Sequence, residues 1–191
     1  MPAAKPYHHG NLRETLLQTS LGLIKSNGIQ SFTLREVARL SGVSHTAPYR
    51  HFRNKEQIVV ELVSASFGRI ADRITYFSLK GHSSSECLEF GTLAYLRFAL
   101  DRPDEFRLLL SLQPDSAALL DRPLASLTAL VKACSFPKVD AQAASRLLWA
   151  NIHGIAELAT RQQAGLTSRK EALEFASQST RLLISGFKFN K

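Results

Sequence analysis

The stretch from Thr33 to Lys55, TLREVARLSGVSHTAPYRHFRNK, constrains the fold of this chain more than any other part of it. Thr33 can cap a first helix, Glu36 three residues later completes a capping-box pattern, and Gly42 can end that helix. Ser44 can cap a second helix after a turn of about three residues. The stretch therefore predicts a helix-turn-helix. The buried stripe of the first helix is expected to consist of Leu34, Val37, Ala38 and Leu40.

The second predicted helix, about Ser44 to Phe52, places Pro48 at the end of its first turn, where the missing amide has little helical bonding to lose. Tyr49, Phe52 and Val43 can face inward, which leaves short polar groups, a methyl group and cations outside. Such groups suit base edges and phosphates in a major groove. An ordinary pair of packed helices is the alternative, but the turn, the caps and the basic face together favour DNA binding. The outward residues are His45, Thr46, Ala47, Arg50 and His51.

Positive charge is concentrated at the beginning of the chain. Residues 1–55 contain eight Lys and Arg against two Glu, a net charge of +6, whereas residues 56–191 contain sixteen against fourteen acidic residues, a net charge of +2. Because phosphate neutralisation supplies most non-specific affinity for DNA, this asymmetry indicates that the first quarter of the chain faces DNA. A basic arm along DNA and a frayed terminus are both compatible with Lys5, His8, His9 and Arg13.

The cysteines and histidines give no indication of a metal or cofactor site. Cys87 and Cys134 are 47 residues apart with no CxxC motif near either, so free thiols are expected. His8 and His9 are adjacent, do not point to one face, and have no third ligand nearby. The chain has no apolar run near the 18 residues that span a bilayer, and its first residues lack the apolar segment of a secretory signal. A cytoplasmic protein without a membrane partner is expected.

The rest of the chain is predicted to be helical, because apolar residues keep helical spacing and no strand-like alternation or internal repeat is found. Asn54 can cap a long helix that begins at Lys55 and ends near Phe77. An all-α fold follows, with a three-helix helix-turn-helix domain over residues 1–55 joined by a long helix to a second domain over residues 56–191. Further helices are expected at residues 11–27, 86–100, 103 onward, 116–135 with a break or kink at Pro123, 140–164 and 168–187.

The last two predicted helices, residues 140–164 and 168–187, suit close packing. Small residues let helices approach closely, so this pair can dock against a second copy as a four-helix interface. Packing within one subunit is the alternative. A homodimer is favoured because a helix-turn-helix that reads DNA usually needs two half-sites. The small and apolar stripe consists of Ala172, Ala176, Ser179, Leu183 and Gly186.

The motifs T-L-R-E-V-A, S-G-V-S, Y-R-H-F and N-K-E resemble the DNA-binding domain of the tetracycline-repressor (TetR) family of bacterial transcription regulators, over residues 11–62. The resemblance implies that Arg35 reaches a base or phosphate, that residues 45–47 lie in the groove, and that residues 33, 49, 51 and 55 contact the DNA backbone. It also implies a helical effector-binding and dimerisation domain after the long helix. The candidate DNA-binding residues are Thr33, Arg35, Ser44, His45, Thr46, Ala47, Tyr49, Arg50, His51 and Lys55.

The segment W-A-N-I-H-G at residues 149–154 resembles the Trp-x-x-x-His-Gly signature of one branch of TetR-family ligand domains, and D-R-P-D-E-F-R-L-L-L from Asp101 resembles the matching segment of that branch. The functional interpretation places Trp149 and His153 beside an effector pocket. The alternative is a core pair in which His153 is hydrogen-bonded to a neighbour such as Glu157, which follows at an i+4 step on the same helical face. The candidate pocket residues are Tyr95, Phe98, Phe106, Trp149 and His153.

These patterns lead us to expect a homodimeric repressor that binds a palindromic operator in double-stranded DNA when empty. An unknown small-molecule effector in the C-terminal domain would release it by a population shift. A non-specific architectural DNA-binding protein without an effector is one alternative. An enzyme with His153 as general base is disfavoured, because the chain has no GxSxG, HExxH, P-loop or GxGxxG motif. Whether the protein represses or activates depends on where the operator lies.

Overall fold

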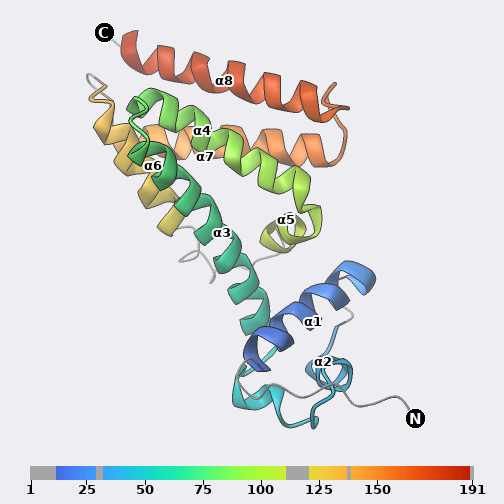
Figure 1. Ribbon diagram of the computed structural model, residues 1–191. Coiled ribbons are helices and arrows are strands. Elements are labelled where there is room, and N and C mark those ends of the chain that lie inside the picture. Colours follow the sequence, from blue (N-terminus) through green and yellow to red (C-terminus); the bar gives the residue numbers. More distant parts are fainter. Residues whose placement is uncertain (1–11, 29–31, 111–120, 137–138, 190–191) are drawn as a thin grey trace. The chain divides into compact units, whose positions relative to one another are not determined.

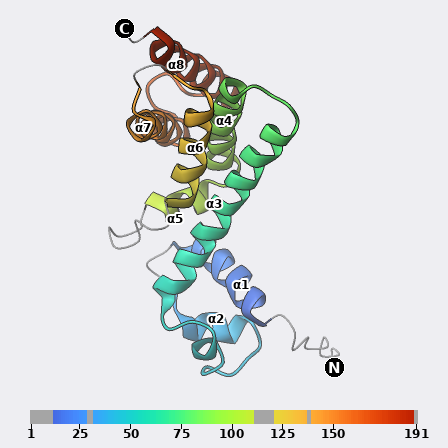
Figure 2. The same ribbon diagram turned by 90° about the vertical axis from the view of Figure 1, so that its left-hand side faces the viewer.

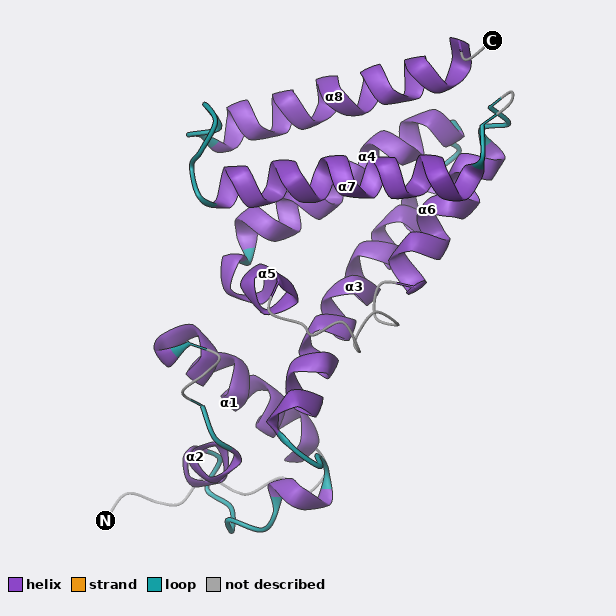
Figure 3. Ribbon diagram, turned by 180° about the vertical axis from the view of Figure 1, so that it is seen from behind, coloured by secondary structure: helices purple, strands orange, loops and turns teal. Residues whose placement is uncertain are grey.

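A computed structural model describes residues 12–28, 32–110, 121–136 and 139–189. These residues form helices and loops and no strand, which confirms the predicted all-α class (Figure 3). The elements are α1 (Leu12–Asn27), α2 (Leu34–Leu40), the 3-10 helix η1 (Pro48–Arg50), α3 (Lys55–Leu79), α4 (Ser84–Asp101), α5 (Pro103–Leu110), α6 (Asp121–Ala133), α7 (Ala141–Thr160) and α8 (Arg169–Phe189).

The chain divides into two compact units, residues 1–63 and residues 64–191. The division falls inside α3, whereas the sequence places the domain boundary at residues 55 and 56, where α3 begins. Each unit has a hydrophobic core of its own. Phe32 and Phe52 are fully buried in the first unit, and Tyr95 and Phe106 are fully buried in the second.

The first unit contains α1, α2, η1 and the beginning of α3 (Figure 2). The hydroxyl of Thr33 accepts a hydrogen bond from the Glu36 amide at 3.2 Å, so Thr33 caps α2 as predicted. Gly42 has φ +69°, and the amide of Val43 donates to the Ala38 carbonyl at 3.0 Å, which closes the C-terminus of α2. Asn54 caps α3 by accepting from the Gln57 amide at 3.0 Å. The predicted cap residues therefore end and begin these helices.

The predicted second helix of the pair, residues 44–52, is not an α-helix. Residues 44–47 form a turn in which the Ala47 amide donates to the Ser44 carbonyl at 3.0 Å, and a single 3-10 turn, η1, follows. Pro48 has no amide hydrogen to donate back along a helix, which favours short turns here. The Ser44 hydroxyl bonds to the Thr46 hydroxyl at 3.2 Å and does not cap a helix.

Two residues predicted to face inward are exposed. Leu40 is 51% exposed, so the buried stripe of α2 ends at Ala38. Tyr49 is 59% exposed, because the 3-10 turn directs its ring away from the core, while Phe52 is buried as predicted. Val43 is half-buried.

In the second unit, α4 packs against α5, α6, α7 and α8, and α7 and α8 lie side by side (Figure 1). Ser83 caps α4 through a capping box with Glu86, and Asp140 caps α7 by accepting from the Ala143 amide at 2.7 Å. Because α4 contacts four other helices, its side chains form the centre of this core. None of the described helices is both long and apolar enough to span a membrane.

Two predicted helix limits differ from the structure. The helix expected to reach Ala164 ends at Thr160, because Gln162 and Ala164 have φ of +54° and +53° and form a turn. The described α6 begins at Asp121, so Pro123 lies in its first turn and does not break it. The remainder of the expected helix, residues 116–120, lies outside the described residues.

Candidate nucleic-acid interface and ligand site

An open groove of about 480 Å³ lies on the first unit beside α2. Its lining includes three predicted DNA-binding residues, Thr33, Arg35 and His45. Arg39 also lines it, one helical turn after Arg35, and the sequence interpretation missed this residue. The i+4 spacing of the two arginines is the signal that could have identified it. The groove therefore carries two guanidinium groups and an imidazole, together with the Glu36 carboxylate.

The turn after α2 exposes the residues that the sequence assigns to base contacts. Ser44, His45 and Thr46 are exposed, and Ala47 is half-buried. Their exposure agrees with the interpretation even though they do not form a helix. The residues assigned to base contacts are therefore presented by a turn.

The residues predicted to contact phosphates lie after this turn. Tyr49 and Arg50 are exposed, and His51 is half-buried with its ring 6.4 Å from that of Phe52. The Lys55 ammonium lies 5.9 Å from the centre of the Phe32 ring, a cation–π contact that holds the ammonium near the core. Lys55 remains partly exposed. All ten predicted DNA-binding residues are thus placed in the first unit.

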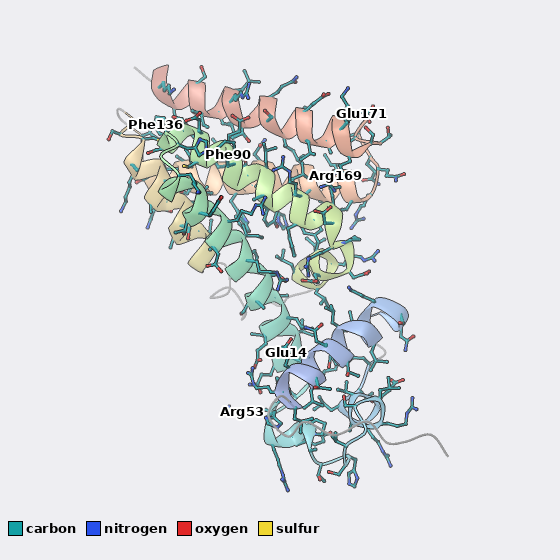
Figure 4. All side chains as sticks on the ribbon, in the orientation of Figure 1. Glu14, Arg53, Phe90, Phe136, Arg169 and Glu171 are labelled. Atoms are coloured by element: carbon teal, nitrogen blue, oxygen red, sulfur yellow. The ribbon has the colours of Figure 1, made fainter. Side chains whose placement is uncertain are left out.

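Two other cations near this surface have different roles. Arg13 belongs to α1, pairs with Glu61 on α3 at 2.5 Å and lies 5.2 Å over the Phe52 ring, so it fastens the first unit together. Arg53 is exposed in the turn before α3 (Figure 4). The possible basic arm formed by Lys5, His8 and His9 lies outside the described residues.

In the second unit, four of the five predicted pocket residues form one aromatic cluster. The Tyr95 ring lies 4.9 Å from that of Trp149, 6.0 Å from that of Phe106 and 6.0 Å from that of His153. Phe98 contacts this cluster from its edge, 6.5 Å from Tyr95. The cluster joins α4, α5 and α7, which lie far apart in the sequence.

The hydrogen-bond partner of His153 is Tyr95, whose Oη lies 2.7 Å from Nδ1 of His153. The sequence interpretation offered Glu157 as an example of a partner, and the structure shows Tyr95 in that place. Burial raises the pKa of Tyr95, and the nearby Glu157 carboxylate adds to the increase. Burial lowers the pKa of His153, and Glu157 opposes that effect only in part. Burial therefore favours the neutral form of both rings, and Tyr95 donates to Nδ1 in the tautomer that carries the His153 proton on Nε2.

The enclosed space beside the cluster is small. A cavity of about 20 Å³, with Tyr95 and Trp149 in its lining, has room for about one water molecule. Phe98, Phe106 and His153 are not among the residues that line it. A ligand larger than water does not fit this particular cavity in the described conformation.

The expected stripe on α8 divides between the interior and the surface. Ala172 and Ala176 are fully buried within the chain, so the small residues pack against neighbouring helices of the same unit. The surface instead carries large apolar side chains, with Phe175 47% and Leu182 73% exposed. On α7 the exposed apolar and small residues share one face: Ala143, Leu147, Ala150 and Gly154.

Two family models match the chain. The model described as "Bacterial regulatory proteins, tetR family" matches residues 16–62, and the model described as "Tetracyclin repressor-like, C-terminal domain" matches residues 91–180. The HTH-type transcriptional regulator BetI of Rhizobium meliloti (strain 1021) is 30% identical over 60 residues. That match spans 31% of this chain and only 30% of BetI.

Solved structures share the fold over nearly the whole chain. A Rhodococcus sp. RHA1 protein of unknown function is 24% identical with a TM-score of 0.76, and the match covers 93% of this chain and 97% of that one. FadR of Bacillus subtilis, solved with stearoyl-CoA, is 15% identical with a TM-score of 0.76, over 91% and 98% of the two chains. PfmR of Thermus thermophilus is 21% identical with a TM-score of 0.65, over 89% and 97%.

Proposed function

This chain belongs to the TetR family of bacterial regulatory proteins, and on that premise we propose that it is a sequence-specific DNA-binding transcriptional regulator. Residues 1–55 would bind the DNA, and residues 56–191 would bind an effector and dimerise. The groove beside α2 carries this proposal, because Arg35, Arg39 and His45 converge on it from a helix and the following turn. Cations and short polar groups on one open surface suit phosphates and base edges.

We propose that Thr33, Tyr49, His51 and Lys55 contact the DNA backbone, and that the turn at residues 44–47 enters the major groove. The exposure of Ser44, His45, Thr46, Tyr49 and Arg50 supports these assignments. Phosphate contacts give affinity and fix the position of the protein, whereas contacts to base edges give sequence preference.

The active form in this proposal is a homodimer that docks through residues 140–164 and 168–187. Exposed apolar side chains on α7 and α8, above all Leu147, Phe175 and Leu182, support it, because water contact with large apolar groups is unfavourable. Two copies would present two DNA-binding units to the half-sites of a palindromic operator.

The regulator would leave its operator when a small molecule binds at the cluster of Tyr95, Phe98, Phe106, Trp149 and His153. Such release requires the ligand to favour a conformation with wrongly spaced DNA-binding units. We also propose that the chain belongs to the branch with the Trp-x-x-x-His-Gly signature, on the strength of residues 149–154. The complex of FadR with stearoyl-CoA supports an effector role for this fold.

Selection of bound sequences from a random duplex pool tests the proposal, followed by titration of the best sequence at two salt concentrations. We expect an inverted repeat with half-sites about one helical turn apart, bound at least roughly 10³-fold more tightly than random DNA. An architectural DNA-binding protein would instead show steep salt dependence without an enriched motif. That result would overturn the proposed function.

A further inference from the structure

Glu157 on α7 has one carboxylate oxygen without a hydrogen-bond partner. Its Oε1 accepts from Arg161 at 2.5 Å. Its Oε2 is buried, and among the described residues it is the sole buried side-chain nitrogen or oxygen without a partner. An unpaired buried acceptor is unfavourable, and more so when it is charged. This oxygen is therefore well suited to accept a hydrogen bond from a ligand.

The surroundings of Glu157 are aromatic. His153 precedes it by one helical turn on the same face of α7, and the Glu157 charge acts on both the His153 imidazole and the Tyr95 hydroxyl. Phe106 and Trp149 complete the cluster, with their ring centres 5.8 and 6.2 Å from that of His153. The faces of such rings attract cations. His153 and Glu157 are partly exposed, so this edge of the cluster borders solvent.

We infer that the site formed by Tyr95, Phe106, Trp149, His153 and Glu157 binds an organic cation, a protonated amine with an apolar body. The ammonium group donates a hydrogen bond to Oε2 of Glu157, and the apolar body lies against the rings. The inference rests on the proposed function, because the amine is the effector of the proposed regulator.

The charge of the site distinguishes amines from other ligands. Arg161, the cation that pairs with Glu157, is bound to Oε1 and leaves Oε2 free to interact. An anionic ligand would meet the Glu157 carboxylate in a poorly hydrated site and be repelled. A neutral alcohol can donate a hydrogen bond, but it gains neither charge attraction nor a cation–π contact.

Binding must also change the environment of Trp149, the single tryptophan of the chain. The apolar body would lie against the rings of the cluster, and Trp149 is one of them. Trp149 lies 4.9 Å from Tyr95 and borders the cavity of about 20 Å³ beside the cluster. Intrinsic fluorescence therefore reports occupation of this site without DNA and without a label.

The experiment measures the binding of three probes of equal chain length, n-hexylamine, 1-hexanol and hexanoate, to the full-length protein at pH 7.5. Trp149 fluorescence is the first readout and calorimetry is the second. We expect the amine to change the Trp149 fluorescence and to bind at least about tenfold more tightly than the other two. Equal or tighter binding of the alcohol or the acid, or no binding of the amine, would overturn the inference.

Two variants and one control localise the effect. Glu157→Gln should remove the preference for the amine, whereas Arg161→Gln should strengthen amine binding severalfold, because it frees Oε1 and leaves the carboxylate without its cation. Glu174→Gln, an exposed carboxylate on α8, is the matched control and should leave all three affinities unchanged. If Glu157→Gln fails to fold, the Arg161→Gln variant tests the inference instead. Unchanged amine binding in Arg161→Gln would then contradict the inference.

Operator selection and amine binding are measured separately, so their failures can be told apart. If amine binding depends on Glu157 but no operator is found, the cation site is supported and the proposed regulatory function is rejected. If a specific operator is found but the protein does not prefer the amine, the proposed regulatory function is supported and an organic cation is rejected as its effector.

Discussion

Ser66 Oγ donates a hydrogen bond to Oε2 of Glu105 at 2.7 Å, which joins α3 to α5 across 39 residues of sequence. Arg69 donates to the same oxygen at 2.7 Å, and Arg102 donates to Oε1 at 2.8 Å. Burial alone would raise the pKa of Glu105, but the hydrogen bonds from Ser66 and Arg102 and the charges of both arginines lower it. The carboxylate is only 4% exposed, and both of its oxygens are paired.

Glu105→Ala should reduce the free energy of unfolding by about 2 kcal/mol. The substitution leaves the Ser66 hydroxyl and two guanidinium groups without their acceptor, and the cost stays below that of a fully buried pair because both arginines are half-exposed at 49%. Urea denaturation monitored by circular dichroism measures this loss of unfolding free energy. The control is Asp104→Ala, whose carboxylate pairs with exposed Arg107 and should cost no more than about 0.5 kcal/mol. Equal losses in the two variants would contradict the role given to Glu105.

Arg35→Ala should weaken binding to the selected operator and reduce the slope of log affinity against log salt by about 1, because one cation fewer neutralises phosphate. Tyr49→Ala should weaken binding without changing the slope, because its side chain is uncharged. Fluorescence anisotropy at several salt concentrations separates the two effects. Arg97→Ala on α4 removes an exposed cation of the other unit and should have no effect. Full operator affinity in the Arg35→Ala, Tyr49→Ala double variant would show that neither residue contacts DNA.

Gly42→Ala should destabilise the protein by about 1 kcal/mol, because φ of +69° is unfavourable for a residue with a Cβ. Gly22→Ala is the matched control, since Gly22 lies inside α1 and a Cβ there meets nothing within 4 Å. The Gly22→Ala change should stabilise the protein by about 0.5–1 kcal/mol, because Ala has a higher helix propensity than Gly. Thermal and urea unfolding of the two variants should give opposite signs, and shifts of the same sign would argue against the helix end at Gly42.

The caps and periodic stripes could be predicted because their signals are local. Thr33 and Asn54 each cap a helix within three residues of their own position, and Gly42 directly follows the end of an apolar pattern. The 3-10 turn at Pro48 was missed because cap and periodicity patterns resemble those of a short α-helix. That misassignment also reversed the expected direction of the Tyr49 ring.

The partners of the buried polar groups could not be predicted, because they lie far apart in the sequence. Ser66 and Glu105 are separated by 39 residues, and Tyr95 and His153 by 58. A helical face shows which side chains lie inward, but it does not show which helix they meet. The sequence therefore placed His153 in the cluster and could offer only a neighbour on its own helix, Glu157, as an example of a hydrogen-bond partner.

Leu182→Glu should shift the proposed homodimer toward monomer. Leu182 is 73% exposed on α8 in the single chain, and a carboxylate at an apolar interface must be desolvated when two copies meet. Sedimentation velocity at several protein concentrations measures the change. Leu110→Glu is the control, because it adds the same charge to an exposed leucine on α5. If both variants keep the wild-type association state, the proposed interface on α7 and α8 must be abandoned.

His153 should make the stability of the protein fall as the solution becomes acidic. Burial lowers the pKa of His153 below its ordinary value of 6.5, and Glu157 opposes this only in part. Between the folded pKa and about 6.5 the unfolded chain binds more protons than the folded one, so the unfolding free energy decreases as pH falls through this window and is unaffected well above it. In the tautomer with the proton on Nε2, the Tyr95 hydroxyl donates to Nδ1 and favours the neutral imidazole, so Tyr95→Phe should raise the pKa of His153 toward 6.5. An NMR titration of the imidazole proton measures the shift, with Tyr76→Phe on α3 as a variant that should leave it in place. An unchanged His153 titration in Tyr95→Phe would mean that burial alone, without the Tyr95 hydrogen bond, keeps this ring neutral.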